Sequence, residues 1–131
     1  MQNKIKTGII LLAGRGSRLE ELTDSKPKCL VEVNQLPIIH RILDELALLD
    51  IDKMILVIGY LGDQIKDYVG TEWKGMEIEY VVNEGWDKTN NVVSLYMALD
   101  RIETNFLLLE GDIVVSKKDL QSFDQLNMLA L

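Results

Sequence analysis

Two glycines and an arginine follow an apolar run near the start of the chain, in the segment LAGRGSRL at residues 12–19. Glycine lets backbone N–H groups approach phosphate oxygens closely, and an arginine can fork onto the same oxygens. The spacing of Gly14, Gly16 and Arg18 therefore suits a bound phosphate. Leu19 stands where a dinucleotide fingerprint needs its third glycine, so that motif is excluded. A plain glycine turn with a surface arginine also fits these residues.

Two further charged residues could act on the same anion. Lys28 follows Pro27 at the end of the glycine loop, where a fixed backbone could hold its point charge over the phosphates. Asp112 follows a strand-like apolar run and Gly111, and Mg²⁺ binds one or two carboxylates together with phosphate oxygens. The alternatives are a solvated loop lysine and a turn aspartate that bonds to nearby backbone N–H groups.

The elements that must position these residues alternate between strand and helix patterns. Apolar runs predict strands at 5–13, 53–58, 77–82 and 105–110, with a short strand or extended segment at 29–33. Three- and four-residue apolar spacings predict helices at 38–49, 62–69, 91–101 and 117–126. This order is typical of βαβ units on a parallel sheet with helices on both faces. Ligands then bind beyond the carboxyl ends of the strands, at Gly14–Arg18, Gly59-Tyr60, Asn83-Glu84 and Gly111-Asp112.

Composition predicts one soluble domain over residues 1–131. Apolar residues make up 47% and charged residues 27%, which excludes disorder, and no apolar run reaches the length of a membrane span. The N-terminal apolar run ends in glycines and arginines, so we interpret it as a strand and not as a signal peptide. Cys29 is the only cysteine, which indicates a cytoplasmic protein without an internal disulfide.

The charge distribution disfavours nucleic acid as a partner. The net charge is −7, and binding to nucleic acid depends on neutralising phosphates. Residues 1–41 carry 7 Lys/Arg and 4 Asp/Glu, whereas residues 42–131 carry 7 and 17. The positive charge therefore gathers around the glycine loop, where it suits a small bound anion, although a solvated basic edge would look the same.

Together these motifs resemble the sugar-phosphate nucleotidyltransferase superfamily. The resemblance rests on LAGRGSRL, Leu22-Thr23, PKCLV at 27–31 and Pro37-Ile38, and it continues through Gly59-Tyr60, NNVVSL at 90–95 and Glu110-Gly111-Asp112. The segment around residues 89–96 is more similar to the phosphocholine cytidylyltransferase branch, with aminoethylphosphonate cytidylyltransferases close by. The implied fold is Rossmann-like and GT-A-like, with a mostly parallel sheet that is incomplete at the C-terminus.

The resemblance also implies roles for individual residues. Arg18 would hold the β- and γ-phosphates, Lys28 would neutralise charge at the α-phosphate and the acceptor, and Asp112 would bind Mg²⁺. Asn83, Asn91 and Ser94 are candidates for base and ribose contacts. The full set implied for nucleotide binding is Leu12, Ala13, Gly14, Gly16, Arg18, Asn83, Asn91 and Ser94. We interpret His40, the only histidine, as structural.

Family members continue well beyond the Gly-Asp element, so we expect a partial domain. The missing part supplies further strands, a second metal-binding aspartate and most of the acceptor pocket. Trp73, Trp86, Tyr60 and Tyr96 are scattered along the sequence and form no evident cage for a quaternary ammonium. An incomplete sheet would expose an apolar edge, which a homo-oligomer would cover.

Three functional hypotheses follow. The first is a Mg²⁺-dependent nucleotidyltransferase that transfers CMP from CTP to a phosphorylated acceptor such as phosphocholine, or a nucleotide to a sugar 1-phosphate. The second is a nucleotide-binding module without catalysis, and the third is a non-functional fragment. No general base is required, because the acceptor phosphate is already an anion and the main task is to neutralise and align two anions.

Overall fold

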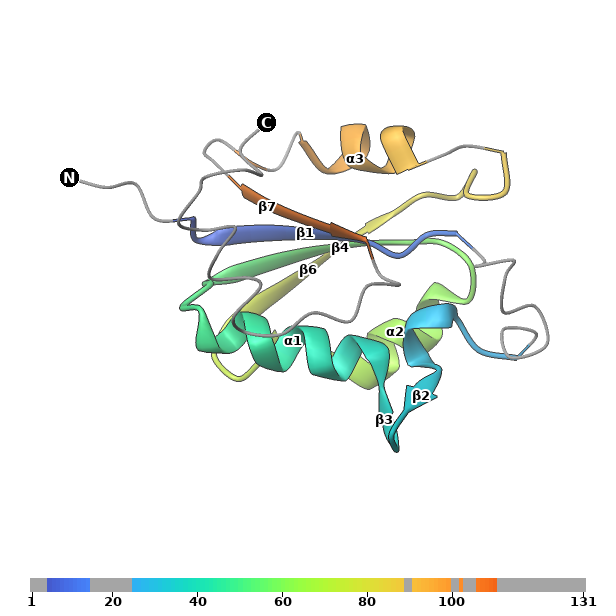
Figure 1. The fold of residues 1–131 in the computed structure, drawn as a ribbon. Helices are drawn as coiled ribbons and strands as arrows, with labels where there is room; N and C mark the ends of the chain where they lie inside the picture. Colours follow the sequence, from blue (N-terminus) through green and yellow to red (C-terminus); the bar gives the residue numbers. More distant parts are fainter. Residues whose placement is uncertain (1–4, 15–24, 89–90, 100–101, 103–105, 111–131) are drawn as a thin grey trace.

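A five-stranded sheet forms the centre of the molecule, in the order β5-β6-β4-β1-β7 (Figure 1). The structure is a computed structural model and describes residues 5–14, 25–88, 91–99, 102 and 106–110. The strands are β1 Thr7–Leu11, β4 Lys53–Ile58, β5 Glu72–Trp73, β6 Met76–Val82 and β7 Phe106–Glu110. β1 pairs in parallel with β4 and β7, and β4 pairs in parallel with β6. The predicted mostly parallel sheet is confirmed.

The central strands are apolar on both faces because helices cover the sheet on both sides. Ile9 of β1 pairs with Ile55 of β4 and with Leu108 of β7. The predicted strand at 53–58 is confirmed, whereas the predicted strand at 5–13 was too long, since the paired segment runs only from Thr7 to Leu11. The chain remains buried beyond it, through Leu12 and Ala13.

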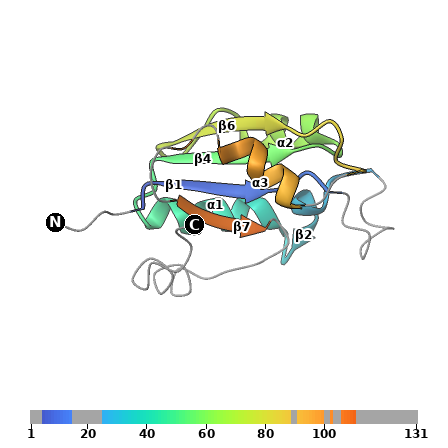
Figure 2. The same ribbon diagram turned by 90° about the horizontal axis from the view of Figure 1, so that it is seen from above.

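In the part of the chain that the structure describes, three α-helices lie on the two faces of the sheet, α1 Ile38–Leu48 and α2 Gly62–Val69 on one face and α3 Asn91–Leu99 on the other (Figures 1 and 2). Each face has its own buried cluster, with Ile10 and Leu56 toward α1 and α2 and Ile9 and Ile55 toward α3. The helices predicted at 38–49 and 62–69 are confirmed to within a residue, and the third begins at the predicted Asn91. Residues 117–126, the last predicted helix, lie outside the described residues.

Short elements near the start of α1 and at the edge of the sheet differ from the prediction. Residues 28–30 form a 3₁₀ turn, and within the short strand or extended segment predicted at 29–33 only β2 Glu32–Val33 is a strand, which pairs with β3 Leu36–Pro37 in a hairpin. Asn34 and Gln35 at the hairpin turn both have positive φ, as a two-residue turn of the right twist requires. β5, which the sequence did not predict, adds an antiparallel edge to β6.

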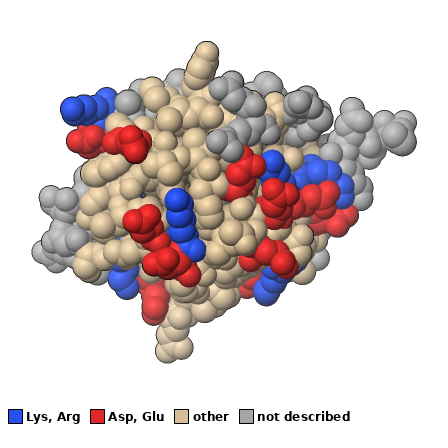
Figure 3. Space-filling view, turned by 180° about the vertical axis from the view of Figure 1, so that it is seen from behind, with Lys and Arg blue, Asp and Glu red and all other residues tan. Residues whose placement is uncertain are grey.

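The exposed surface carries both signs of charge close together, as Figure 3 shows for one face. Oppositely charged side chains form ion pairs, among them Lys6–Asp50 at 3.0 Å and Lys53–Glu79 at 2.8 Å. Among the described residues, none of the helices combines the length and the apolar character that a membrane crossing requires.

His40 lies in an aromatic cluster that joins α1, α2 and β5. Its Nδ1 lies 2.8 Å from the Tyr68 hydroxyl, and its ring stands edge-on to Trp73 with 4.9 Å between centroids. Its Nε2 lies 3.3 Å from Asp44 Oδ2, and Asp44 Oδ1 accepts a hydrogen bond from Trp73 Nε1 at 3.0 Å. The cluster packs the two helices against the edge strand, and a structural role for His40 stays a prediction that this geometry supports.

The Asp44 carboxylate is expected to make the stability of this cluster pH-dependent. Burial raises its pKa, but the hydrogen bonds from Lys74 and Trp73 and the charge of His40 outweigh burial, and the pKa lies below the ordinary 3.8. A lowered pKa in the folded state means that the contribution to stability is complete above the unfolded pKa and is lost as the pH falls through the folded one.

We therefore expect the stability difference between the wild type and Asp44→Asn to shrink as the pH is lowered from about 5 to about 2. Urea unfolding at each pH measures that difference. Asp67→Asn, at an exposed position on α2, is the matched control and should show a much smaller pH dependence. A difference for Asp44→Asn that stays constant down to the acid limit would contradict the prediction.

Candidate functional site

The parallel strands β6, β4, β1 and β7 end side by side at the carboxyl edge of the sheet, and backbone hydrogen bonds hold the segments that follow the first three of them. Leu12 N donates to Val57 O at 2.7 Å, and Tyr60 N donates to Ala13 O at 2.9 Å. Asn83 N donates to Ile58 O at 2.8 Å. The parallel pairing thus continues past the strand ends, and it fixes the backbone that leads into the glycine loop.

Gly59 lies at the centre of this edge, where only a residue without a side chain fits. A Cβ on Gly59 would lie 2.7 Å from Trp86 Cβ, 2.9 Å from Ala13 O and 2.9 Å from Asn83 O. Two of these three neighbours are backbone oxygens of adjacent segments, which cannot rotate away. The close packing of three segments around Gly59 was missed in the sequence, where it showed only as a glycine at a strand end.

The buried side chains of Asn83 and Ser94 bond to each other. Asn83 Nδ2 donates to Ser94 Oγ at 3.1 Å, and Asn83 Oδ1 accepts from Gly85 N at 3.1 Å. Only 3% of Asn83 and 2% of Ser94 is exposed. The structure therefore brings together two of the three residues proposed for base and ribose contacts. The third, Asn91, is the first residue of α3.

The glycine loop is described only at its two ends. Gly14 is exposed, and no described heavy atom lies within 4 Å of the place where its Cβ would be. At the other end, Lys28 is half-buried in the 3₁₀ turn, and Ser25 O accepts a hydrogen bond from Gln64 Nε2 of α2 at 2.9 Å. Gly16 and Arg18 lie outside the described residues, so their predicted phosphate contacts stay predictions.

Cys29, next to Lys28, is buried against the core that α1 covers. Burial raises the pKa of its thiol to about 12, so the thiol is protonated at neutral pH. This cysteine is therefore a packing residue that anchors the turn carrying Lys28.

Tyr60 and Trp86 are in contact beside Gly59. Their ring centroids lie 5.1 Å apart, with the rings inclined at 63°. Tyr60 and Trp86 are far apart in the sequence, and the parallel pairing of β4 and β6 brings together the segments that follow these strands. Trp73 lies instead in the His40 cluster, and Tyr96 is 73% exposed on α3.

The predicted metal residue, Asp112, lies outside the described residues. β7 ends at Glu110, which pairs with Leu11 of β1, so both strands reach the same edge of the sheet. Among the described residues no three histidine, cysteine or acidic side chains gather closely enough to hold a metal ion. Mg²⁺ binding therefore stays a prediction that depends on Asp112.

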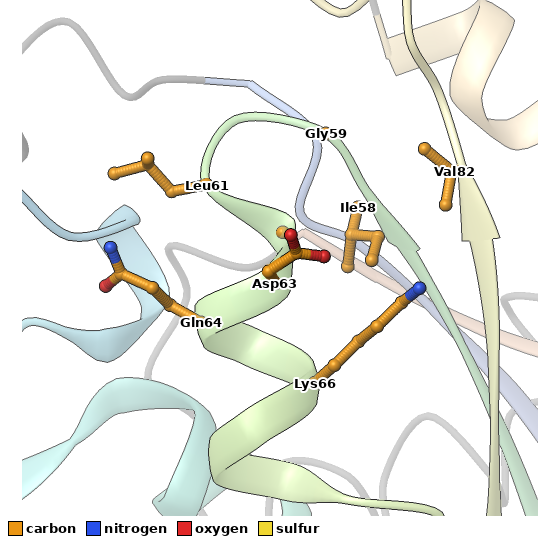
Figure 4. A pocket seen from close by; sticks show the side chains of 8 residues that line it. Ile58, Gly59, Leu61, Asp63, Gln64, Lys66 and Val82 are labelled. Atoms are coloured by element: carbon orange, nitrogen blue, oxygen red, sulfur yellow. The ribbon is translucent and has the colours of Figure 1, made fainter.

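A shallow cavity of about 360 Å³ opens beside Gly59, between the ends of β4 and β6 and the start of α2 (Figure 4). Asp63 and Lys66 of α2 extend alongside it, toward Ile58 and Val82, whereas Gln64 extends the other way. Its lining is Ile58, Gly59, Leu61, Gly62, Asp63, Gln64, Lys66 and Val82. The cavity continues the carboxyl edge of the sheet, where α/β proteins bind their ligands.

Comparisons with known proteins agree with this arrangement. The family described as the MobA-like NTP transferase domain matches residues 8–123. A CMP-5'-(3-aminopropyl)phosphonate synthase from Streptomyces rubellomurinus is 39% identical over 106 residues, which are 81% of this chain and 17% of that protein. A UTP–glucose-1-phosphate uridylyltransferase from Haloferax volcanii is 34% identical over 104 residues, which are 79% of this chain and 42% of that protein.

A solved structure shares the fold. The CTP:phosphocholine cytidylyltransferase from Streptococcus pneumoniae is 32% identical, with a TM-score of 0.74 over 89% of this chain and 50% of that one. The chain therefore belongs to the nucleotidyltransferase family of MobA-like NTP transferase domains. It spans at most half the length of each of these three relatives.

Proposed function

We propose that this chain carries the nucleotide-binding part of a Mg²⁺-dependent nucleotidyltransferase. The proposed reaction transfers CMP from CTP to a phosphorylated small molecule such as phosphocholine and releases pyrophosphate. The observation that carries the proposal is the start of the glycine loop at Ala13-Gly14, held by hydrogen bonding at the packed carboxyl edge of a parallel sheet. A cytoplasmic location, which the single buried cysteine favours, belongs to the same proposal.

In the proposed reaction an oxygen of the acceptor phosphate attacks the α-phosphorus of the triphosphate. The bond from that phosphorus to its bridging oxygen breaks, and pyrophosphate leaves with the bonding electrons. The backbone from Leu12 to Gly16 would hold the nucleotide, Arg18 the leaving phosphates, and Lys28 the charge at the α-phosphate. Mg²⁺ held by Asp112 would supply further charge neutralisation when bound.

The names of the relatives favour CMP as the transferred group, and one relative favours a second candidate function. The Streptomyces and Streptococcus relatives are named for cytidylyl products or substrates. The Haloferax relative is named for uridylyl transfer to glucose 1-phosphate at 34% identity, which favours a sugar-1-phosphate nucleotidyltransferase as the alternative. The two differ in both base and acceptor, so one crossed assay separates them.

The test is pyrophosphate release by the full chain, crossing CTP, UTP, dTTP and GTP with phosphocholine, 2-aminoethylphosphonate and glucose 1-phosphate. We expect turnover with CTP and one phosphoalcohol or phosphonate. Lys28→Ala would remove a positive charge beside the reacting phosphates and Asp112→Asn a carboxylate ligand of Mg²⁺, so we expect each to lower turnover by about 100-fold or more. EDTA should abolish turnover. Lys53→Ala removes a lysine from the opposite end of β4 and should leave turnover unchanged.

The alternatives give different results in the same experiment. Turnover with UTP and glucose 1-phosphate would replace the cytidylyl proposal with the sugar-1-phosphate one. CTP binding by calorimetry without any turnover would support a binding module. A folded chain that neither binds nor turns over any triphosphate would overturn the proposed function.

A further inference from the structure

Asn83 forms hydrogen bonds with three neighbouring segments at the carboxyl edge of the sheet. Its backbone N–H extends the pairing of β6 with β4 by donating to Ile58 O at 2.8 Å. Its side-chain oxygen accepts from Gly85 N, and its side-chain nitrogen donates to Ser94 Oγ of α3. The side chain therefore connects the end of β6, the turn that follows, and the first turns of α3.

The contacts of Asn83 differ from those of a residue that reads a nucleobase. With 3% of the residue exposed, both ends of its amide already bond to neighbouring protein groups. Ser94 is equally buried, and its hydroxyl faces the amide. A side chain that selects a base by hydrogen bonding has to direct a donor or an acceptor at the ligand.

The position of Asn83 also affects the backbone at the start of the glycine loop. The hydrogen bond from Gly85 N to Asn83 Oδ1 shapes the turn that packs Trp86 against Gly59. The packing is close, because a Cβ added to Gly59 would lie 2.7 Å from Trp86 Cβ. Gly59 in turn packs against Ala13 O, next to Gly14. On the other side, the α3 residue Ala98 shares a buried cluster with Ala13. Since this packing is tight, a shift of the turn or of α3 would displace Ala13, where the glycine loop begins.

We infer that Asn83 and Ser94 are positioning residues of the proposed nucleotide site, which act through their mutual hydrogen bond and do not contact the base. The inference rests on the proposed function and deepens it. It assigns these side chains to holding the turn at 83–86 and α3 against Ala13, at the start of the glycine loop, so they contribute equally to the binding of every triphosphate.

The test is a double-mutant cycle read by nucleotide affinity. CTP, UTP and GTP dissociation constants are measured by calorimetry for the wild type, Asn83→Ala, Ser94→Ala and the double variant. We expect Ser94→Ala to weaken all three nucleotides by about tenfold in the wild-type background and to have no further effect in the Asn83→Ala background. The ratio of CTP to UTP affinity should stay unchanged throughout.

Tyr80→Phe is the matched control on the same strand. It also removes one partly buried side-chain hydrogen bond, from Tyr80 Oη to Gly70 O at 2.6 Å, but away from the carboxyl edge. We expect it to leave all three affinities within about twofold of the wild type. If circular dichroism shows that Asn83→Ala is unfolded, Ser94→Ala alone tests the inference: it should weaken the binding of CTP, UTP and GTP by the same factor.

Three results would overturn the inference while leaving the proposed function intact: a CTP-to-UTP ratio altered about tenfold, losses that multiply in the double variant, or unchanged affinity in both single variants. A folded wild type that binds no triphosphate is a different outcome. It would overturn the proposed function first, and the inference with it.

Discussion

Replacing Gly59 with alanine is expected to lower the free energy of unfolding by about 3 kcal/mol, because the new methyl group would overpack a junction of three segments. It would meet Trp86 Cβ at 2.7 Å and the carbonyl oxygens of Ala13 and Asn83 at 2.9 Å. Those oxygens belong to backbone that cannot rotate aside. The segments must therefore separate, and we expect CTP affinity to fall with them. Urea unfolding and calorimetry measure the two effects.

Gly14→Ala is the stability control for this prediction. The added methyl group meets no described heavy atom within 4 Å, so we expect a change of less than about 0.5 kcal/mol. Equal stability of the Gly59→Ala variant and the wild type would mean that the three segments around Gly59 can move apart at little energetic cost. That result would contradict the tight packing on which the further inference also depends.

Replacing Leu46 with alanine is expected to cost about 3 kcal/mol of unfolding free energy, because it leaves a cavity between α1 and the sheet. Leu46 is fully buried in the cluster that holds α1 and α2 against the strands. A domain of this size is stable by only about 5–15 kcal/mol, so the loss is a large fraction of the total. The urea midpoint measures it.

Leu48 provides the control on the same helix. It is 61% exposed, so Leu48→Ala should change the free energy of unfolding by less than about 0.5 kcal/mol. Similar effects of the two substitutions would show that α1 is not packed on the sheet as the structure has it.

The long elements could be predicted from the sequence because each carries its own signal. The strand at 53–58 is apolar without a break from Met54 to Ile58, as expected for a strand covered by helices on both faces, and the helix at 62–69 has its apolar residues on one side. The hairpin of β2 and β3 could not be predicted in this way. Strands of two residues have no periodicity, and the turn residues Asn34 and Gln35 include no glycine to mark positive φ.

The location of the candidate site could be predicted from the sequence more readily than the contacts within it. The strand ends at Gly14, Gly59 and Asn83 meet at one edge because parallel strands must end together. The contact of Tyr60 with Trp86 depends on how two distant segments pack, which no local pattern contains. The residue types of Asn83 and Ser94 indicated hydrogen bonding, but only the structure shows that each bonds to the other.

The position of β1 in the sheet has a consequence for the order in which the molecule assembles. On one side β1 pairs with β7, which follows it by about 99 residues along the chain, as in Ile9 with Leu108. Contacts between residues so far apart in the sequence are expected to form late in folding, because forming them restricts the conformational freedom of the long chain segment between them. We therefore expect the carboxyl edge of the sheet to gain β7 only after β1 and β4 have paired. A triphosphate that binds only the completed edge would shift the folding equilibrium toward the native state by mass action.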